Sequence, residues 1–502
     1  MSKINLEKRF QNLVDNVLEY DPSADINQIK KAWNFTKLAH TGQVRLSGGP
    51  YAAHPLDVAL RLSGWKLDTT SIIAALLHDS IEEGGATRDD LVKGFGEEVA
   101  FLVDGVTKVT DLRLRGSKEA EFVESLRKML LVMAKDLRVV LIKLADRLHN
   151  LKTMYAIPRE GQLKNALETL DVYAPLAERL GMGDVKGELE DLSFKYAYSE
   201  DYDELVKNSK IYFEEAEQDI LKMKKVLLKA FLKEGIKVEI QGRQKHLYSL
   251  WRKLQRPEID WDYERIHDIV ALRIIVDKIS ECYGALGIVH AQYRPVPHIG
   301  VSDFIAQPKP NGYRSIHTKV FGPGGRIVEV QIRTQKMHEQ AESGIAAHWA
   351  YSDQKGKNAS DKILERGDIE VNPEKINWVK QLVDWQKEMN DSEEFLRAVK
   401  FDAFKHRNFI FSPEGDVYDL PAGATPVDFA YAVHTNLGNY LSQAKVDGRI
   451  VPLDYKLQSG QVVEILKTKN PKGPSSGWLD FVVTTLARRE INRYLRSDKA
   501  LR

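Results

Sequence analysis

Two histidines and two aspartates in the first third of the chain are the kinds of side chain that hold a divalent cation. They are His54, the adjacent pair His78 and Asp79, and Asp146. Imidazole nitrogens and carboxylate oxygens suit Mn²⁺, Zn²⁺ or Fe²⁺, and such a set leaves coordination positions for a water or a phosphate oxygen. The sequence therefore predicts a metal site with room for a substrate.

Apolar helices would position these four ligands. The segment TTSIIAALLHDSIEE is typical of a buried helix that presents His78 and Asp79 at its end, and RVVLIKLADRLHN of one that ends at Asp146. Pro55 favours the first turn of a further helix and would leave His54 at its N-terminal edge. The order and spacing of the four residues match the HD-domain phosphohydrolases, in which a bound metal acts on a phosphate ester.

Two acidic residues after the ligand pair would serve the nucleophilic water. Glu82 and Glu83 follow Asp79 by three and four residues, which on one helix brings both carboxylates near the ligands. A metal lowers the pKa of bound water from about 15.7 toward about 7, and a neighbouring carboxylate can accept its proton. Asn150 and Arg45, the latter in a glycine-rich loop before His54, are expected to hold the substrate. We interpret His40 and His149 as structural.

The composition limits the class of protein. The chain has 502 residues, 43% of them hydrophobic, which predicts about three domains. A net charge of +1 argues against wholesale electrostatic capture of nucleic acid or membrane. Cys282 is the only cysteine, so an internal disulfide or a cysteine zinc cluster is excluded. With no apolar run near the ~20 residues of a membrane span and no signal-peptide pattern, we expect a soluble cytosolic protein.

The spacing of apolar residues divides the chain into segments of different structure. Helical periodicity runs to about residue 200, and strands rich in Ile and Val follow after Gly235. The expected parts are a helical metal-dependent hydrolase domain at 1–200, a helical connector at 201–235, a mixed-sheet α+β domain at 236–352, a mobile loop and helix linker at 353–404, a compact β-rich module at 405–467, and a basic helical tail at 468–502 with Arg488, Arg489, Arg493 and Arg496.

A second set of polar residues predicts a nucleotide site without a P-loop, because the sequence has no GxxxxGK[ST] motif. The period of two in RIVEVQIRT places Glu329, Gln331 and Arg333 on one face of a strand. Asp268 opens the strand DIVALRIIVD. An aspartate and a glutamate on neighbouring strands can share a Mg²⁺ that bridges nucleotide phosphates.

Basic and aromatic residues near these carboxylates would bind the rest of a nucleotide. Arg243, Lys245 and Lys253 would neutralise phosphate charge, while PKPNGYRSIHT combines phosphate donors with an aromatic plane for a base. The latter residues are Lys309, Asn311, Tyr313 and His317. Phosphoryl-type transfer depends mostly on such positioning and charge neutralisation. The alternative, on composition alone, is an ordinary sheet with a solvated charged face.

Together these motifs resemble the RelA/SpoT family, which makes and destroys the alarmone (p)ppGpp. The resemblance runs from HTGQVRLSGGPYAAHP through LADRLHNLKTM, GRQKHLYSLWRKL, PKPNGYRSIHT and EVQIRT to the module after residue 405. It implies an HD-type hydrolase domain that uses Mn²⁺, a nucleotidyltransferase-like synthetase domain that uses Mg²⁺ with ATP and GTP or GDP, and a small β-grasp TGS domain. The sequence given ends before the cysteine-rich and ACT modules usual in this family.

The resemblance also implies a role for individual residues. In the hydrolase, the four ligands match the Mn²⁺ site, Glu82 and Glu83 match the acidic pair, and Arg45, Asn150 and Thr153 match substrate contacts. In the synthetase, Asp268 and Glu329 match the Mg²⁺ site, with Glu329 as the residue that activates the 3′-hydroxyl. The remaining matches are Tyr313 on the acceptor guanine, Arg243 and Arg273 around the adenine, and Lys253, Lys309 and His317 on phosphates.

Departures from the family pattern leave alternatives open. PHIGVSD stands where a basic RxKD stretch is common, Glu83 replaces the usual Asp, Leu46 replaces a usual Lys, and LGNYLSQ lacks the His or Arg of many TGS domains. The main reading is a bifunctional (p)ppGpp enzyme of the stringent response. One alternative is a hydrolase whose synthetase half acts only as a nucleotide sensor, and another is a non-catalytic regulator that contacts the ribosome or tRNA. Oligomer formation stays open, and no membrane contact is expected.

Overall fold

The computed structural model describes residues 6–110, 131–133, 135–257, 259–266, 268–297, 300–309, 312–344, 407–468 and 473–501. These residues form two compact units, one before and one after the undescribed stretch at 345–406. The expected loop at 353–404, Asn311 and part of PHIGVSD lie outside the described residues. No helix in the described part of the chain combines the length and the apolar character that crossing a membrane requires.

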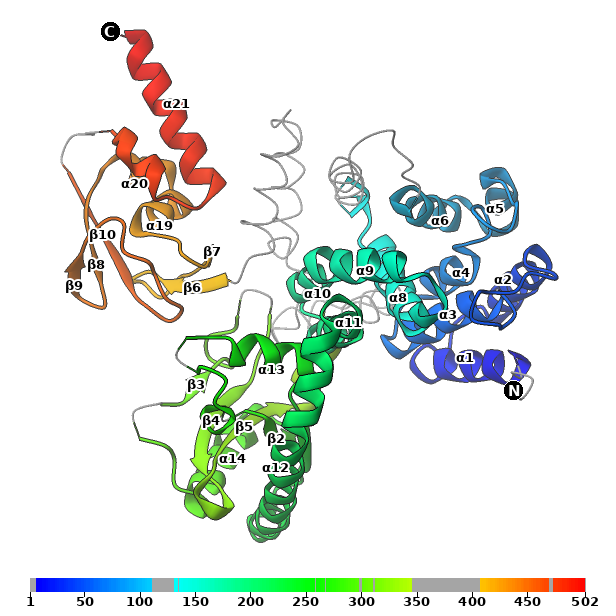
Figure 1. The fold of residues 1–502 in the computed structure, drawn as a ribbon, viewed down its shortest axis with the longest axis horizontal. Helices are drawn as coiled ribbons and strands as arrows, with labels where there is room; N and C mark the ends of the chain where they lie inside the picture. The colour runs from blue at the N-terminus through cyan, green and yellow to red at the C-terminus, as the bar shows by residue number, and fades with distance from the viewer. Residues whose placement is uncertain are drawn as a thin grey trace. The chain divides into compact units, whose positions relative to one another are not determined.

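The first unit begins with a purely helical region (Figure 1). Its helices are α1 (Leu6–Tyr20), α2 (Ile26–Ala39), α3 (Ala53–Gly64), α4 (Thr69–Leu77), α5 (Arg88–Phe95), α6 (Glu97–Thr110), α8 (Arg138–Lys152), α9 (Arg159–Glu168), α10 (Ala174–Arg179) and α11 (Gly183–Ala197), with short turns η1 (Met154–Ala156) and η2 (Thr169–Tyr173). Helix α4 is central, because every side chain from Ser71 to Leu77 is buried. The expected helical region is confirmed.

Two local features near the ligands differ from the prediction: the segment that follows α4 and the position of Asp146 in its helix. Helix α4 stops at Leu77, and His78 to Gly84 continue as turns, because the N–H of Ser80 bonds to the carbonyl of Leu77 instead of four residues back. Asp146 does not end its helix but lies inside α8, which continues to Lys152. A carboxylate is tolerated there because buried polar groups around it satisfy both of its oxygens, as the site geometry below shows.

The second part of the first unit is a five-stranded mixed sheet. Its strands are β1 (Glu239–Gln244), β2 (Val270–Val276), β3 (Ser302–Asp303), β4 (Ile316–Phe321) and β5 (Ile327–Thr334), in the order β1-β2-β5-β4-β3. The pair β2 and β5 is parallel, whereas the other neighbours are antiparallel. The helices and turns of this part are α12 (Ser199–Lys233), α13 (Leu247–Leu254), η3 (Tyr263–Arg265), α14 (Ile279–Gln292), η4 (Pro323–Gly325) and α15 (Gln335–Ser343).

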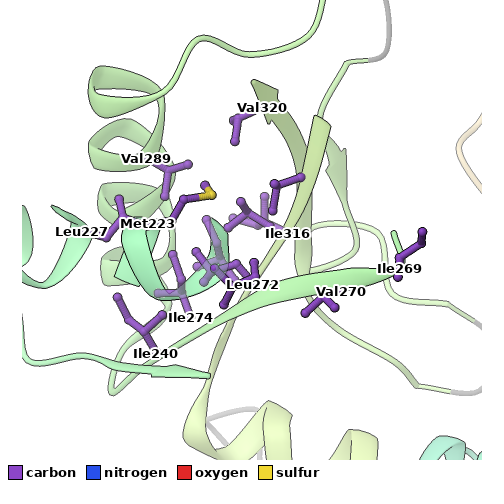
Figure 2. Close-up of a cluster of buried hydrophobic side chains, with 14 of the residues drawn as sticks. Met223, Leu227, Ile240, Ile269, Val270, Leu272, Ile274, Val289, Ile316 and Val320 are labelled. Carbon is purple, nitrogen blue, oxygen red and sulfur yellow. The ribbon is translucent and has the colours of Figure 1, made fainter. Parts of the chain in front are cut away.

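The segment predicted as a connector is one continuous helix that belongs to the core of the sheet domain. Met223 and Leu227 of α12 are fully buried and pack with Leu272, Ile274 and other strand residues (Figure 2). Its exposed positions carry the charged residues that suggested a connector. The helix begins in an aromatic cluster, in which Phe194 of α11 lies against Tyr248 and Trp251 of α13, with ring centroids 5.5 and 5.0 Å apart. Helix α11 therefore contributes to both the helical region and the sheet domain.

The second unit is a small β module with a helix packed on it. Strands β6 (Arg407–Phe411) and β7 (Val417–Pro421) form one sheet, and β8 (Leu441–Val446), β9 (Arg449–Val451) and β10 (Val463–Lys467) form another in the order β10-β8-β9. Its helices are α19 (Pro426–Val433), α20 (Thr435–Asn439), η7 (Ser476–Asp480) and α21 (Thr485–Leu501). Thr425 and Asp428 form a capping box at the start of α19.

The predicted basic tail packs against this module and contributes to its structure. Ala487 and Ile491 of α21 are fully buried against Tyr431 and its neighbours on α19. Asp428, fully buried, accepts hydrogen bonds from the backbone N–H groups of Val483 and Thr484 just before α21. The four predicted arginines lie on the exposed face of the helix: Arg488, Arg489, Arg493 and Arg496.

Candidate functional site

The structure brings the four predicted metal ligands together between α3, α4 and α8. Nε2 of His54 lies 3.2 Å from Nε2 of His78, 3.2 Å from Oδ1 of Asp146 and 3.4 Å from Oδ2 of Asp79. Nε2 of His78 lies 3.1 Å from Oδ1 of Asp79. The ligand atoms of His54, His78 and Asp146 all fall within 4.8 Å of one another, which is close enough to share one ion.

The other nitrogen of each histidine shows where its proton is. Nδ1 of His78 lies 2.8 Å from the carbonyl oxygen of Ala75, which can only accept, so Nδ1 carries the proton. Nδ1 of His54 lies 2.8 Å from Nδ1 of His149. Nδ1 of His149 also lies 3.2 Å from a guanidinium nitrogen of Arg45, and a guanidinium can only donate. His149 Nδ1 is therefore the acceptor, and His54 Nδ1 carries the proton.

Four acceptor groups with no proton between them thus point into one small space. Both Nε2 atoms present lone pairs there, beside the carboxylates of Asp79 and Asp146. Burial lowers the pKa of His54 to about 4, so this ring is neutral at pH 7. Burial opposes ionisation of Asp146, but the charge of Lys143 outweighs it and holds the pKa of Asp146 well below its usual range. The set fits a bound divalent cation, which would satisfy all four groups.

Partners outside the cluster hold the carboxylates in place. Asp146 accepts from Nζ of Lys143 at 2.8 Å through Oδ2 and from Nδ2 of Asn150 at 2.6 Å through Oδ1. The hydroxyl of Tyr51 donates to Oδ2 of Asp79 at 3.0 Å. Such contacts orient metal ligands and support their affinity. Lys143 and Tyr51 were not predicted; Lys143, three residues before Asp146, could have been found from helical spacing.

Of the predicted substrate residues, Asn150 contacts the ligand Asp146 directly and Arg45 contacts Asn150. Arg45 donates to Oδ1 of Asn150 at 2.7 Å, which joins the glycine-rich loop to α8. Thr153 caps the end of α8, and its hydroxyl bonds to the carbonyl of Asn150 at 3.2 Å. Glu82 and Glu83 are exposed in the turns after α4. The negative charge of Glu83 is one cause, after burial and Asp79, of the raised pKa of Tyr51.

His149 differs most from its predicted place. It does not cap or merely pack in its helix, because both ring nitrogens have polar partners at the metal cluster. Its spacing of three residues from Asp146 and four from Thr153 places it on the ligand face of α8. This spacing was the feature of the sequence that could have predicted the position of His149 beside the ligands. His40, read as structural, stacks on Tyr51 with ring centroids 4.6 Å apart and contacts the amide oxygen of Gln43 at 2.7 Å.

A second site is a cavity of about 310 Å³ on the face of the sheet opposite to the apolar core. Six residues predicted to bind nucleotide line it: Arg243, Arg273, Lys309, Tyr313, His317 and Gln331. Arg333, on the same face of β5, also lines it. The predicted alternation of β5 is confirmed, since Val330 and Ile332 face the core. The side-chain oxygen of Gln331 and Nε of Arg273 are buried without a hydrogen-bond partner among the described residues.

The two predicted Mg²⁺ ligands are ionised but already carry protein partners. Oδ2 of Asp268 lies 2.6 Å from Nζ of Lys245, and Oδ1 lies 2.6 Å from Nζ of Lys253. Burial raises the pKa of Asp268, but these lysines outweigh it and lower the pKa to about 2. Glu329 lies 3.3 Å from Nδ1 of His317, and despite burial its pKa is lowered to about 2. Carboxylates are the ligand type that Mg²⁺ prefers, so the pair fits this ion.

Asp268, Glu329, Lys245 and Lys253 do not line the cavity itself, although their predicted roles would place them at one nucleotide. The charge of Asp268 still acts on Glu329, as one cause that raises its pKa. The ring of Tyr313 is covered by Nζ of Lys309, 5.1 Å from the ring centroid. Burial lowers the pKa of Lys309.

Sequence reasoning missed the opposite wall of the cavity, which comes from α10 and α11 of the helical region. Asp184 accepts from Arg243 at 2.8 Å, and Glu342 of α15 accepts from Arg273 at 2.7 Å. Gly187 lets α11 approach the start of α13, because an added Cβ would lie 2.2 Å from the ring of His246. No local pattern in the sequence relates Asp184 to Arg243, which are far apart along the chain.

These observations define a class of protein: a helical domain with a divalent-cation site, followed by an α+β domain with a polar pocket and by a small β module. Family models match in that order. The HD domain matches residues 32–183, the region found in RelA / SpoT proteins matches 242–356, and the TGS domain matches 408–467.

Relatives match almost the whole chain. It is 43% identical to the guanosine-3′,5′-bis(diphosphate) 3′-pyrophosphohydrolase of Aquifex aeolicus over 99% of this chain and 68% of the relative. It is 42% identical to the bifunctional (p)ppGpp synthase/hydrolase SpoT of Escherichia coli over 98% and 68%, and 46% identical to a GTP pyrophosphokinase of Myxococcus xanthus over 96% and 62%. The chain belongs to the RelA/SpoT family.

The chain thus spans about two thirds of the length of these relatives. Solved structures match smaller parts. The small alarmone synthetase 1 of Bacillus subtilis, bound to its product pppGpp, is 23% identical over 37% of this chain and 96% of that chain, with a TM-score of 0.24.

Proposed function

We propose that this chain is a cytoplasmic bifunctional enzyme of the stringent response. It removes the 3′-pyrophosphate of (p)ppGpp at the HD site with Mn²⁺, and it transfers a pyrophosphoryl group from ATP to the 3′-hydroxyl of GTP or GDP at the sheet cavity with Mg²⁺. The observation that supports the hydrolase best is the convergence of the side-chain nitrogen and oxygen atoms of His54, His78, Asp79 and Asp146. Relatives with both activities in their names support the pairing of functions.

In hydrolysis, His54, His78, Asp79 and Asp146 would hold a divalent cation, which when bound would lower the pKa of a water toward about 7. Glu82 or Glu83, one turn beyond the ligands, accepts the proton of that water. The water oxygen would form a bond to the phosphorus attached to the 3′-oxygen while the bond from that phosphorus to the 3′-oxygen breaks. The 3′-oxygen would take up a proton, which yields pyrophosphate and GDP or GTP. Arg45 and Asn150 hold the phosphates, with Thr153 at the end of α8 beside them.

The donor set favours Mn²⁺ over Mg²⁺ at this site. Two of the four donors are imidazole nitrogens, whereas Mg²⁺ prefers oxygen ligands in octahedral geometry. The synthetase site offers only carboxylates, Asp268 and Glu329, and nucleotide phosphates would complete a Mg²⁺ shell there.

In synthesis, the cavity residues neutralise and orient two nucleotides. Arg243 and Arg273 hold the donor ATP, and Lys309 and His317 face its phosphates. Tyr313 offers its ring to the acceptor guanine. Glu329, ionised at neutral pH, accepts a hydrogen bond from the 3′-hydroxyl, whose oxygen bonds to the β-phosphorus of ATP as AMP leaves. Most of the catalysis would come from this positioning.

The hydrolase is tested with ppGpp and purified protein. Wild type with Mn²⁺ should release pyrophosphate, and Asp79→Ala should lose that release while it keeps the synthetase activity. The matched control is Arg61→Ala on α3, whose side chain pairs with Glu188. Retained hydrolysis in Asp79→Ala would refute the site.

The synthetase is tested with ATP, GTP and Mg²⁺. Wild type should form pppGpp and AMP, and Glu329→Ala should form neither while it still hydrolyses ppGpp. If wild type hydrolyses ppGpp but makes no pppGpp under any metal condition, the hydrolase with a nucleotide-sensing second domain replaces the bifunctional enzyme.

Contact with tRNA or the ribosome through the TGS module is a further part of the proposal. The exposed arginines of α21 beside this module offer phosphate donors. Cosedimentation with ribosomes should weaken steeply between low and high salt if phosphate contacts dominate. If the protein does not cosediment with ribosomes even at low salt, the proposed contact with the ribosome is wrong.

A further inference from the structure

A line of polar contacts leads from the first helix to a predicted metal ligand. Arg9 of α1 pairs with Asp57 of α3, whose Oδ2 lies 3.2 Å from Nε2 of His149. Nδ1 of His149 lies 2.8 Å from Nδ1 of His54. We propose that His149 and Asp57 are positioning residues that set the tautomer and ring orientation of His54. This inference rests on the metal site of the proposed hydrolase.

The direction of each hydrogen bond follows from groups that have only one role. Arg45 can only donate, so Nδ1 of His149 is an acceptor and its proton lies on Nε2. The carboxylate of Asp57 can only accept, and it faces that Nε2–H. His54 therefore donates from Nδ1 into His149. Its Nε2 is left with a lone pair that faces His78 and the ligand carboxylates.

Without Asp57, the Nε2–H of His149 would lose its acceptor, and only the donor of Arg45 would still favour this tautomer. The other tautomer places a hydrogen on Nδ1, where it would meet the donors of both Arg45 and His54. His54 would relieve this conflict by carrying its own proton on Nε2, the atom that should bind the cation. Metal-bound histidines commonly depend on such outer partners, and their loss typically weakens metal affinity about 10- to 100-fold.

The placement of the two residues suits this task. His149 follows Asp146 by one turn on α8, and Asp57 follows His54 by three residues on α3. The His149 side chain is mostly buried, at 17% exposure, whereas that of Asp57 is 27% exposed at the edge of the site. Arg9 adds a positive charge behind Asp57, which keeps the carboxylate turned toward α1 and α8.

The test measures Mn²⁺ affinity of the full chain, without substrate, by titration calorimetry and by electron paramagnetic resonance of free Mn²⁺. His149→Phe keeps a planar ring but cannot accept from His54, and Asp57→Ala removes the partner of His149. Both should weaken Mn²⁺ binding about 10- to 100-fold. Asp57→Asn should lose less, because its amide oxygen can still accept from Nε2 of His149. The thermal midpoint of the metal-free protein is recorded for every variant.

Arg61→Ala is the matched control, since Arg61 lies one turn beyond Asp57 on α3 and pairs with Glu188 at 2.7 Å. It should bind Mn²⁺ as wild type does. If His149→Phe fails to fold, the two Asp57 variants decide the matter. Equal Mn²⁺ affinity in Asp57→Ala and wild type overturns the positioning role but leaves the hydrolase intact. A wild-type protein that neither binds Mn²⁺ nor hydrolyses ppGpp overturns the proposed function itself.

Discussion

Lys143 and Asp146 form an ion pair three residues apart on α8, with Nζ 2.8 Å from Oδ2. Both residues are buried, at 8% and 4% exposure. A buried cation beside a metal ligand supplies positive charge while the site holds no ion, and so keeps the carboxylate ionised and ready to bind. The pair is a structural element of the site that its four ligands alone do not reveal.

Replacing Lys143 by Met should destabilise the metal-free protein by about 3–5 kcal/mol, because it leaves the charge of Asp146 buried and uncompensated. Added Mn²⁺ would supply that charge. The rise in melting temperature on Mn²⁺ addition should therefore be larger in Lys143→Met than in wild type. Thermal unfolding with and without Mn²⁺ checks this, with Lys210→Met, which removes an exposed pair with Glu214 on α12, as control. Equal rises would contradict it.

Asp184→Asn should lower the KM for ATP several-fold in the synthesis reaction. The carboxylate of Asp184 lies 2.8 Å from Arg243 in the cavity and competes with nucleotide for that guanidinium. Removing its charge frees Arg243 and reduces repulsion of phosphate. Steady-state kinetics measure the change. Glu188→Gln, on the same helix but paired with Arg61 and Lys152, should leave KM unaltered. A raised KM in Asp184→Asn would mean that the carboxylate supports the arginine instead.

His338→Gln should flatten the acid side of the stability profile. Burial first, and then the charge of Arg333, lower the pKa of His338 to about 4 from an ordinary 6.5. Because the unfolded chain takes up this proton first, the stability from the neutral ring is present above pH 6.5 and is lost as the pH falls toward 4. Because solvent screens part of this interaction, the contribution is on the order of 1–2 kcal/mol. Urea unfolding of the metal-free protein at several pH values gives the free energy of unfolding as a function of pH for wild type and variant. Parallel curves for the two proteins would contradict this role of His338.

Asp428→Ala should loosen the attachment of α21 to the TGS module. Asp428 is fully buried and accepts from the backbone of Val483 and Thr484 and from both hydroxyls of Thr425 and Thr484. Its loss leaves several buried donors unsatisfied, at about 1–3 kcal/mol for each group that finds no water. Hydrogen exchange of the full chain should speed up around 482–487 while the first unit stays unchanged. Protection equal to wild type would show that the apolar contacts of α21 are sufficient.

Much of the fold could be predicted from the spacing of apolar residues, and the metal ligands from the types and order of polar residues. The helical region, the mixed sheet and the alternation along β5 follow local spacing of apolar residues, and the four metal ligands stood out because their side-chain types are costly to bury without an ion. The predicted end of the helix at His78 is confirmed, but the helical spacing assumed for Glu82 and Glu83 was wrong because the hydrogen bonding changes to turns after Leu77. Asp146 was misplaced because a carboxylate inside an apolar helix is stable only with partners such as Lys143.

Relations between distant segments were beyond reach of the sequence. The wall that α11 contributes to the sheet cavity contacts Arg243 across a gap of 59 residues in the chain, and local patterns do not encode such a contact. Helix α12 was taken for a connector because its charged face dominates the composition, although its buried stripe contains Met223, Leu227 and Phe231. His149 was assigned a structural role because a single histidine on an apolar helix more often packs than supports a ligand.

The shared helix α11 also determines how the two proposed activities can be separated by experiment. Phe194 sits in the same apolar cluster as Trp251 and the sheet, while Asp184 near the other end of α11 reaches the cavity. A fragment that begins at residue 200 would lack Phe194 and the wall of the cavity that α10 and α11 provide. If such a fragment showed no synthesis, the cause would be the damaged fold and not an inactive site. Single substitutions in the intact chain are therefore the better way to remove one activity and keep the other.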